Sequence, residues 1–523
     1  MGIAQADPQE GGGMFSARVY RGGFSALLLL LFALPALAQS FRVQCPDNTV
    51  LHPKSSAGVV SDGIKCQQIS GGDGYSTMGD GTQTYMFSFG PLSGLADIKQ
   101  GLPGTEPSSV FNTLWPYPIH DGVHDVSTFN GAVGLVPDPD AGGAITGHVD
   151  PRPIMDVGVM NGNIPAPTMA IDEDDEFFLT LTNVGMIMRP DLFEKHTVHF
   201  HGYPNASSFY DGVPDASVAI NIGGSFTYYY LAPDAGTYFW HCHITPPEHL
   251  QMGMVGQIYV RPRQNRVPTG ASLYAGLQAQ QNDLRTRCGT DILCSTPLPR
   301  VDNGATHQLN KSGSPTLYAY NDGDGSTAYD VEYPIQIHGF DPNFHFVGMT
   351  FNPEPFTDMK DKYFLLNGRS YPDTVTPGPM STQVSDGSAH FSQPLPTLIN
   401  IPLGGKALLR ISDLDVTEFQ TLASLGIPMH VIGINARLLR DMSGNDLTYY
   451  TNSITLGGGE SIDVILDASA LDASGNFRYP AGSTYYLYTP NLDHLSNDAE
   501  NFGGLMTEVH ICGAFDPITK LCK

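Results

Sequence analysis

Charged residues are scarce in this chain, and positive charges are the scarcest. Only 15% of the 523 residues are Asp, Glu, Lys or Arg, and 26 basic against 52 acidic residues leave a formal net charge of −26 at pH 7. This excess of negative charge disfavours nucleic acid and anionic membrane surfaces as partners. Beyond the N-terminus no apolar run is long enough to span a bilayer, so we expect no membrane span.

Long helical patterns are also lacking, whereas turn-forming residues are plentiful. The chain contains 58 Gly and 40 Pro, which suits many short strands joined by turns. Segments 84–89, 177–184 and 225–233 read as strands, the first of them as the first strand of the fold. Period-two alternation between turn residues predicts an all-β protein of sandwiches or barrels, and the length predicts two or three domains.

The N-terminus has the pattern of a secretory signal. Basic residues precede the apolar run 24–34, which is too short to span a bilayer, and residues 36–38 read Ala-Leu-Ala, a small-x-small cleavage site. We therefore expect 1–38 to be a signal peptide and the protein to be exported, to a periplasm or outside the cell. Met14 is an alternative start to Met1.

Seven cysteines fit an oxidising compartment. One of them, Cys242, lies between two histidines and is reserved for a metal. Fifteen connectivities of the other six are open, and nearness in sequence favours the local pairs Cys45 with Cys66, Cys288 with Cys294, and Cys512 with Cys522.

The motif around which the chain is organised is His241-Cys242-His243. Downstream lie His249 and Met254. A type 1 copper site takes one thiolate, two imidazoles and a weak axial thioether, so a second imidazole must come from elsewhere. The predicted type 1 copper ligands are His196, Cys242, His249 and Met254. Met252 competes as axial ligand, and Met254 is preferred for its spacing of five residues from His249.

Side-chain alternation divides the histidines into two groups. In a strand over 240–244, Cys242 faces one way and its two neighbours face the other. The segment 196–202, HTVHFHG, divides in the same way, with His196 on one face. The opposite face gathers four imidazoles for a second metal site, namely His199, His201, His241 and His243. Zinc is the alternative metal, but structural zinc sites usually have four closed ligands, not one Cys with six His.

These segments resemble the multicopper oxidases and the related copper nitrite reductases. NGNIPAP at 161–167, DGVP at 211–214 and INIGGSFTYYY at 220–230 add to the likeness, which is strong over about 155–262 and weak over 360–510. The resemblance implies two cupredoxin-like Greek-key β-barrels or sandwiches. One departure is that His249 follows Cys242 by seven residues, where laccase-like members have five.

The second barrel reads as an eroded copy of the first. His196, His199 and His201 align with Ile427, His430 and Ile432, and the aligned Tyr488, Thr489 and Pro490 replace the His-Cys-His motif. The copy has lost its type 1 site but keeps His430, where the family's type 2 copper ligand lies. The expected organisation is a signal peptide (1–38), a disulfide-tied arm (39–80), copper-binding cupredoxin domain 1 (81–262, with a loop insertion at 95–150), a linker (263–330) and degenerate cupredoxin domain 2 (331–523).

The resemblance implies a laccase-like oxidase. A phenol or low-valent metal ion gives one electron to type 1 copper at the exposed edge of His249. The electron passes through Cys242 to His241 or His243, and dioxygen is reduced at a type 2/type 3 copper site. Two alternatives stay open: a blue-copper electron carrier or copper-handling protein, and a nitrite reductase-like enzyme, whose pattern of His then His five later fits His196 and His201.

The number of second-site ligands is the weak point of this interpretation. A full trinuclear cluster in the family uses four His-x-His pairs, and this chain supplies two plus His430. Either fewer coppers bind, or other histidines or a partner subunit complete the cluster. The other candidates are His338, His345 and His494. A homotrimer, as in two-barrel relatives, would bring His430 of one subunit to the copper of the next, whereas in a monomer His430 is structural.

Overall fold

We analysed a computed structural model that describes residues 41–118, 125–202, 207–232, 234–280, 297–349, 355–383 and 389–523. The predicted signal peptide lies outside these residues. Among them, no helix combines the length and apolar character that crossing a membrane requires.

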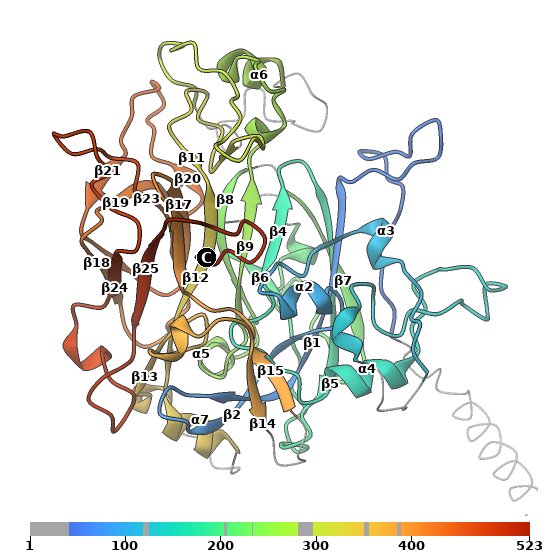
Figure 1. Ribbon diagram of the computed structural model, residues 1–523. Coiled ribbons are helices and arrows are strands. Elements are labelled where there is room, and N and C mark those ends of the chain that lie inside the picture. Colours follow the sequence, from blue (N-terminus) through green and yellow to red (C-terminus); the bar gives the residue numbers. More distant parts are fainter. Residues whose placement is uncertain are drawn as a thin grey trace, which may run out of the picture. The chain divides into compact units, whose positions relative to one another are not determined.

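The first domain consists of two facing sheets (Figure 1). One sheet has the order β2-β1-β5-β7, built from Gln83–Pro91, Ile64–Thr77, Glu176–Gly185 and Ser225–Leu231, with β3 (Glu106–Pro107) on β1. The other has the order β4-β9-β8-β6, built from Met169–Asp172, Val255–Arg261, Gly236–His241 and His199–Phe200. Inward-facing residues of both sheets, such as Leu179 and Trp240, share one apolar core.

The second domain repeats this plan. One sheet has the order β13-β12-β17-β23-β19-β20, built from Tyr363–Leu366, Val331–Phe340, Lys406–Asp413, Ser461–Asp467, Met429–Ile434 and Arg437–Leu438, with β21 (Tyr449–Thr451) on β19. The other has the order β16-β25-β24-β18-β22, built from Ile399–Pro402, Met506–Cys512, Thr484–Tyr488, Gln420–Leu425 and Ser453–Leu456. The parallel pairs β12–β17 and β16–β25 match β1–β5 and β4–β9, so the predicted all-β fold with an internal repeat is confirmed.

Helices and short hairpins occupy the connections. The helices are α2 (Leu95–Lys99), α3 (Ser108–Phe111), α4 (Pro151–Gly158), α5 (Pro246–Gln251), α6 (Leu273–Gln280) and α7 (Pro342–Met349). Single 3-10 turns lie at Val126–Thr128, Ser208–Tyr210, Arg263–Arg266, Phe356–Asp358, Asp373–Val375 and Leu492–His494. Two hairpins are β10–β11 (Leu317–Tyr318, Ala328–Tyr329) and β14–β15 (Met380–Gln383, Ala389–Gln393). The insertion at 95–150 thus holds short helices, and its Phe111 and Leu135 share an apolar cluster with Phe41, Ile64 and Val184.

The expected arm at 39–80 contains a core strand, which corrects the sequence-based boundary. β1, which pairs with both β2 and β5, begins at Ile64. Its polar, Gly-rich sequence is typical of a loop. The glycines are needed because neighbouring groups approach the strand too closely to leave room for a Cβ. A Cβ on Gly71 would lie 2.7 Å from the His196 ring, and one on Gly74 would lie 2.7 Å from the Gly162 carbonyl oxygen. The segment 84–89 is a strand, as predicted, but it is the second one.

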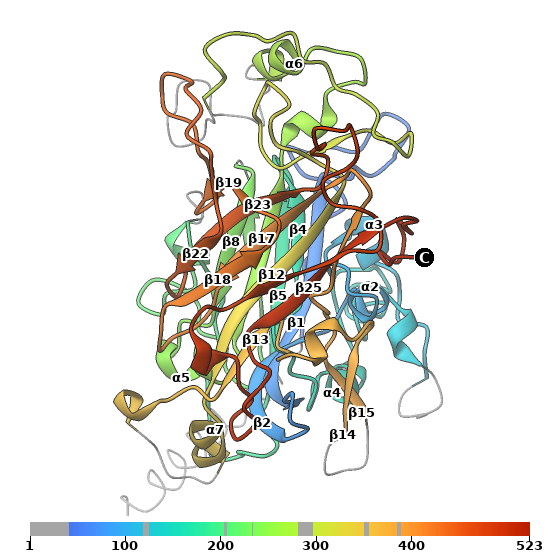
Figure 2. The same ribbon diagram turned by 60° about the vertical axis from the view of Figure 1, so that its left-hand side comes forward.

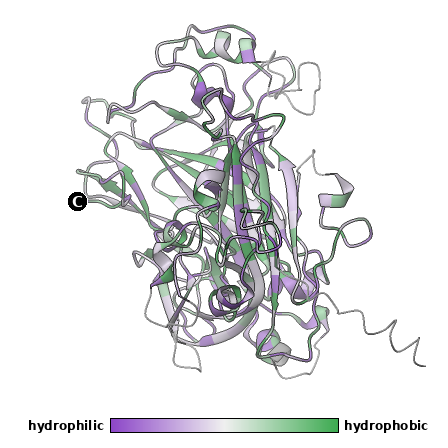
Figure 3. Cartoon of the chain, turned by 90° about the vertical axis from the view of Figure 1, so that its right-hand side faces the viewer, coloured by the Kyte–Doolittle hydropathy of each residue, from purple (hydrophilic) through white to green (hydrophobic). Residues whose placement is uncertain are grey.

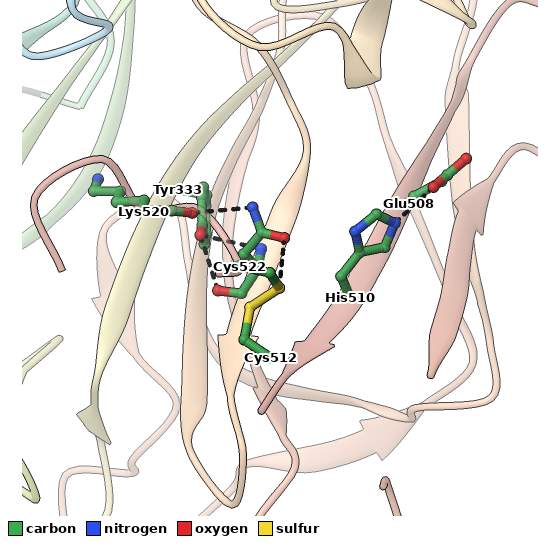
Figure 4. Close-up of a disulfide and its surroundings, with 7 residues drawn as sticks. Tyr333, Glu508, His510, Cys512, Lys520 and Cys522 are labelled. Carbon is green, nitrogen blue, oxygen red and sulfur yellow. Dashed lines mark hydrogen bonds and ion pairs between the residues drawn. A yellow bond between two sulfur atoms is a disulfide. The ribbon is translucent and has the colours of Figure 1, made fainter. Parts of the chain in front are cut away.

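Two of the three predicted disulfides are confirmed, Cys45–Cys66 and Cys512–Cys522. The second ties the C-terminal segment to β25, where the Lys520 carbonyl accepts a hydrogen bond from Asn400 (Figure 4). Among the described residues Cys242 is the free cysteine, and it is buried. Cys288 and Cys294 lie outside the described residues.

The two domains pack through β8 of the first against β17 and β23 of the second, and through β9 against β12 (Figure 2). Thr237 donates a hydrogen bond to Asp463 (2.6 Å), and Ser461 donates one to the Thr237 carbonyl (2.6 Å). Apolar residues concentrate on the strands and hydrophilic ones on the loops (Figure 3). The faces of β8 and β9 that meet the second domain therefore combine apolar packing with buried hydrogen bonds.

Candidate metal centre

The histidine motifs lie on two paired strand ends. In the β6–β8 pairing, His199 is opposite His241 and Phe200 is opposite Trp240. Trp240 and Cys242 join the core of the first domain, whereas Phe239 joins a separate cluster with Leu414 of the second domain. The predicted alternation is therefore observed, with the thiol inside the barrel and the flanking imidazoles outside it.

The inward cluster is His196, Cys242 and His249, whose candidate ligand atoms lie within 4.8 Å of one another. All three residues are completely buried, and His249 Nδ1 lies 3.2 Å from Cys242 Sγ. Neither ring nitrogen of His196 has a hydrogen-bond partner among the described residues. Because buried polar atoms are nearly always satisfied, two orphaned nitrogens beside a thiol fit a bound metal ion.

The backbone around the sulfur fits Met254 as the fourth ligand. Its N–H donates to the His249 carbonyl (2.8 Å), and its carbonyl accepts from the Cys242 N–H (3.1 Å). Met252 is bonded instead to the Glu248 carbonyl. Both thioethers lie in the same buried core. The assignment of Met254 therefore stays a prediction, which is supported by its main-chain hydrogen bonds to His249 and Cys242.

The side of His249 that was expected to be exposed is covered. The ring is fully buried, and its Nε2 faces the carboxylate of Glu194 at 3.7 Å, a side chain that is 29% exposed. Burial lowers the pKa of His249, but Cys242 and Glu194 together raise it to about 9, and the nearby His249 ring lowers the pKa of Glu194. Sequence reasoning missed Glu194 because this contact is tertiary.

The outward cluster is His199, His201 and His241, again with candidate ligand atoms within 4.8 Å. The Nε2 atoms of His201 and His241 are 3.0 Å apart. His243 adjoins them, with ring centroids 5.0 Å from His199 and 5.5 Å from His241. The structure therefore gathers the four predicted imidazoles on one face.

Hydrogen bonds from Nδ1 to main-chain carbonyls orient two of these rings. His199 Nδ1 lies 2.7 Å from the Asp211 carbonyl, and His241 Nδ1 lies 2.7 Å from the Cys242 carbonyl. Because a carbonyl only accepts, each Nδ1 is the protonated nitrogen and each Nε2 has a free lone pair. Burial lowers the pKa of His241 to about 3 and that of His201 to about 4, so both rings are neutral at pH 7 and suited to bind a metal.

The second domain of the same chain covers part of this face. The turn before β23 places Gly459, with φ of +92°, against His201: a Cβ there would lie 2.8 Å from His201 Nδ1. Phe239 packs edge-on against His201 and flat on His241. Any side chain at 459 would therefore displace a candidate ligand.

His430 is not brought to this cluster within the chain. It pairs with Ile465 on β23, roughly 15–20 Å along the chain from Gly459 at the rise of a strand. Its Nε2 bonds Thr448 (2.9 Å) and its ring stacks on Tyr450 at 4.4 Å. Its role as a copper ligand stays a prediction that requires a neighbouring subunit.

The three other histidines considered for the second site lie in neither cluster. His338 Nε2 bonds the Leu250 carbonyl, and His345 lies between the carbonyls of Tyr85 and Gln251. His494 contacts Gln420 and Glu418. These contacts assign structural roles to all three.

Comparison with known proteins places the metal motifs in a family. Residues 146–265 match a profile described as multicopper oxidase. The laccase abr2 of Aspergillus fumigatus is 34% identical over 109 residues, which cover 20% of this chain and 17% of the relative. The multicopper oxidase MmcO of Mycobacterium tuberculosis is 32% identical over 114 residues, which cover 20% of this chain and 21% of the relative. The chain therefore spans about a fifth of the length of these relatives.

Solved structures are similar at lower identity. The blue copper oxidase of Nitrosomonas europaea has a TM-score of 0.46 at 16% identity, covering 85% of each chain. The copper nitrite reductase of the same organism has a TM-score of 0.42 at 12% identity, covering 86% of this chain and 96% of that one.

Proposed function

We propose that this chain, whose residues 146–265 match the multicopper oxidase profile, is a member of that family, a copper-dependent oxidoreductase that oxidises phenols or low-valent metal ions one electron at a time and reduces dioxygen. The observation that carries the proposal is that the two clusters are covalently connected through adjacent residues of the main chain. Cys242, of the buried cluster, is joined through the main chain to His241 and His243 of the outward face.

The donor sets fit copper at both places. A thiol, two imidazoles and a thioether suit type 1 copper, held here by Cys242, His196, His249 and Met254. The outward imidazoles suit type 2 or type 3 copper, held by His199, His201, His241 and His243. When bound, copper would supply one-electron redox chemistry at the first cluster and dioxygen reduction at the second.

His249 and Glu194 form the proposed contact with the reductant. The ring directs Nδ1 toward the sulfur and Nε2 toward the Glu194 carboxylate. Because Glu194 is partly exposed, it can accept a hydrogen bond from a phenol hydroxyl or attract a metal cation, and the acidic protein favours cations generally. The buried ring excludes water from the sulfur while leaving a short path to the surface.

Copper stoichiometry, spectroscopy and oxygen uptake test the proposal together. Purified, copper-loaded protein should contain more than one copper per chain, show a thiolate-to-copper absorption band, and consume dioxygen with a phenol. One copper per chain, with the band but no oxygen uptake, would instead establish the electron-carrier alternative. That alternative is favoured by the distance of His430 from the outward face.

A nitrite reductase-like activity is the third candidate from the sequence. Its pattern uses His196 and His201, which lie in the buried and in the outward cluster respectively. Nitrite consumption assayed beside oxygen uptake separates the two activities. Export stays a proposal, and the two observed disulfides fit the oxidising compartment that it requires.

A further inference from the structure

The helix that carries His249 ends on the second domain. α5 lies in the segment between Cys242 and Met254, and its last residue, Gln251, is completely buried. The side chain donates to Asp361 Oδ1 (2.9 Å) and accepts from the Asp341 N–H (3.0 Å). Its main-chain carbonyl lies 2.9 Å from His345 Nε2. Every one of these partners belongs to the second domain.

Neighbouring contacts make this attachment rigid. His338 Nε2 bonds the Leu250 carbonyl at 2.9 Å, one residue earlier. The other ring nitrogen of His345, Nδ1, lies 2.6 Å from the Tyr85 carbonyl on β2, so the neutral ring donates either to this carbonyl or to the one beside Nε2, and it stacks on Phe340 at 3.6 Å. The end of α5 is therefore fixed to β2 and to α7 by groups that are themselves buried and packed.

From these contacts we infer that the second domain positions the first domain's type 1 copper ligands through Gln251. His249 lies two residues before Gln251 and Met254 three residues after it, so a shift of this anchor moves both ligands. Hydrogen-bonded groups behind a metal ligand set its orientation and the properties of the metal. The inference rests on the proposed type 1 site, and it gives a function to a barrel that has lost its own thiol.

A general role in domain packing is the competing explanation, and the chain offers a matched control. Gln257 on β9 is also fully buried, and its amide donates to the Arg410 carbonyl (3.0 Å) and to Ser412 Oγ (2.8 Å) of the second domain. It is the same residue type at the same domain interface, but it lies in a regular strand. Removing it should weaken the interface without moving α5.

The test compares Gln251→Leu with Gln257→Leu in the full, copper-loaded chain. Both variants should unfold at lower urea concentration than the wild type. Only Gln251→Leu should shift the thiolate absorption band and the reduction potential, and release copper about tenfold faster. Should Gln251→Leu fail to fold, His338→Phe, which removes the bond to the Leu250 carbonyl, is measured in its place with the same expectation.

Two outcomes overturn the inference. One is a Gln251→Leu or His338→Phe protein with the wild-type band, potential and copper release rate. The other is a Gln257→Leu protein that changes these quantities as much as Gln251→Leu does. A wild type without any thiolate band would instead refute the proposed type 1 site itself, so the two failures are distinguishable.

Discussion

The sharpest test of the buried cluster is a single methyl group on Gly71. This residue lies in β1 and faces the ring of His196. A Cβ added there would lie 2.7 Å from Cδ2, 3.3 Å from Cγ and 3.5 Å from Nε2 of that ring. Since carbon atoms pack best at about 3.5–4.0 Å, Gly71→Ala must push the imidazole by about 1 Å or bend the strand.

A displacement of that size is large for a metal ligand. Metal–ligand distances are held to about 0.2 Å, so the ring cannot keep both its place and its bond. We expect copper affinity to fall at least about tenfold, or about 1.4 kcal/mol, and the thiolate band to shift or weaken. Overpacking should also lower the free energy of unfolding by about 1–3 kcal/mol.

Gly72→Ala is the control for that loss of stability. A Cβ at the next residue points to the other face of β1 and would meet Val184 at 2.8 Å and the Gly185 carbonyl at 2.9 Å. Urea unfolding should show similar destabilisation of both variants, whereas copper titration and the visible spectrum should be altered in Gly71→Ala alone. If Gly71→Ala binds copper with wild-type affinity and spectrum, His196 is not a ligand.

Three further predictions follow from the described geometry. Cys242→Ser should abolish the visible band, and a variant that stays coloured would refute the thiolate assignment. Glu194→Gln should raise KM for a cationic or phenolic reductant several-fold while leaving the visible band in place; an unchanged KM would exclude Glu194 from the contact. Burial lowers the pKa of His345 from its usual 6.5 to about 3, so the unfolded chain binds more protons below pH 6.5. The contribution of His345 to the free energy of unfolding should therefore fall on acidification, by about 3 kcal/mol at pH 4, and urea titrations of His345→Gln should lack this part of the slope.

Strand alternation explains why so much of both clusters could be predicted. The side chains of Cys242 and His241 point to opposite faces of the strand simply because the backbone is extended, which is a local property. The internal repeat could be recognised for a similar reason, because the sequence patterns around His199 in the first domain and His430 in the second follow the same alternation. The partition of histidines between an inner and an outer group therefore did not require knowledge of the fold.

Features set by tertiary contact were not predictable. β1 has the composition of a loop, and only the packed structure shows that Gly71 makes room for His196. Likewise, nothing in the residues around Glu194 indicates that it covers His249. Pro246-Pro247 opens helix α5 because the first helical turn needs no backbone donors. The attachment of that helix to the second domain, however, depends on residues some ninety positions away.

The contacts of His430 and of the outward face oppose the predicted homotrimer. In one chain, the turn at Gly459 already lies against His201, and His430 is offset from that turn by roughly 15–20 Å of strand. A neighbouring subunit would have to bring His430 to an outward face that its own chain partly covers. The His430 ring would also have to give up Thr448 and its stacking on Tyr450.

We therefore expect His430→Ala to leave copper per chain and oxygen uptake unchanged, with a loss of about 1 kcal/mol in the free energy of unfolding from the broken hydrogen bond. Metal analysis, oxygen electrode measurements and light scattering on the same sample check this. A fall in the non-blue copper and in turnover, in a wild type that is trimeric, would contradict the expectation. It would show that the second cluster is completed between subunits, because within one chain His430 lies too far from the outward cluster to be a ligand of its metal.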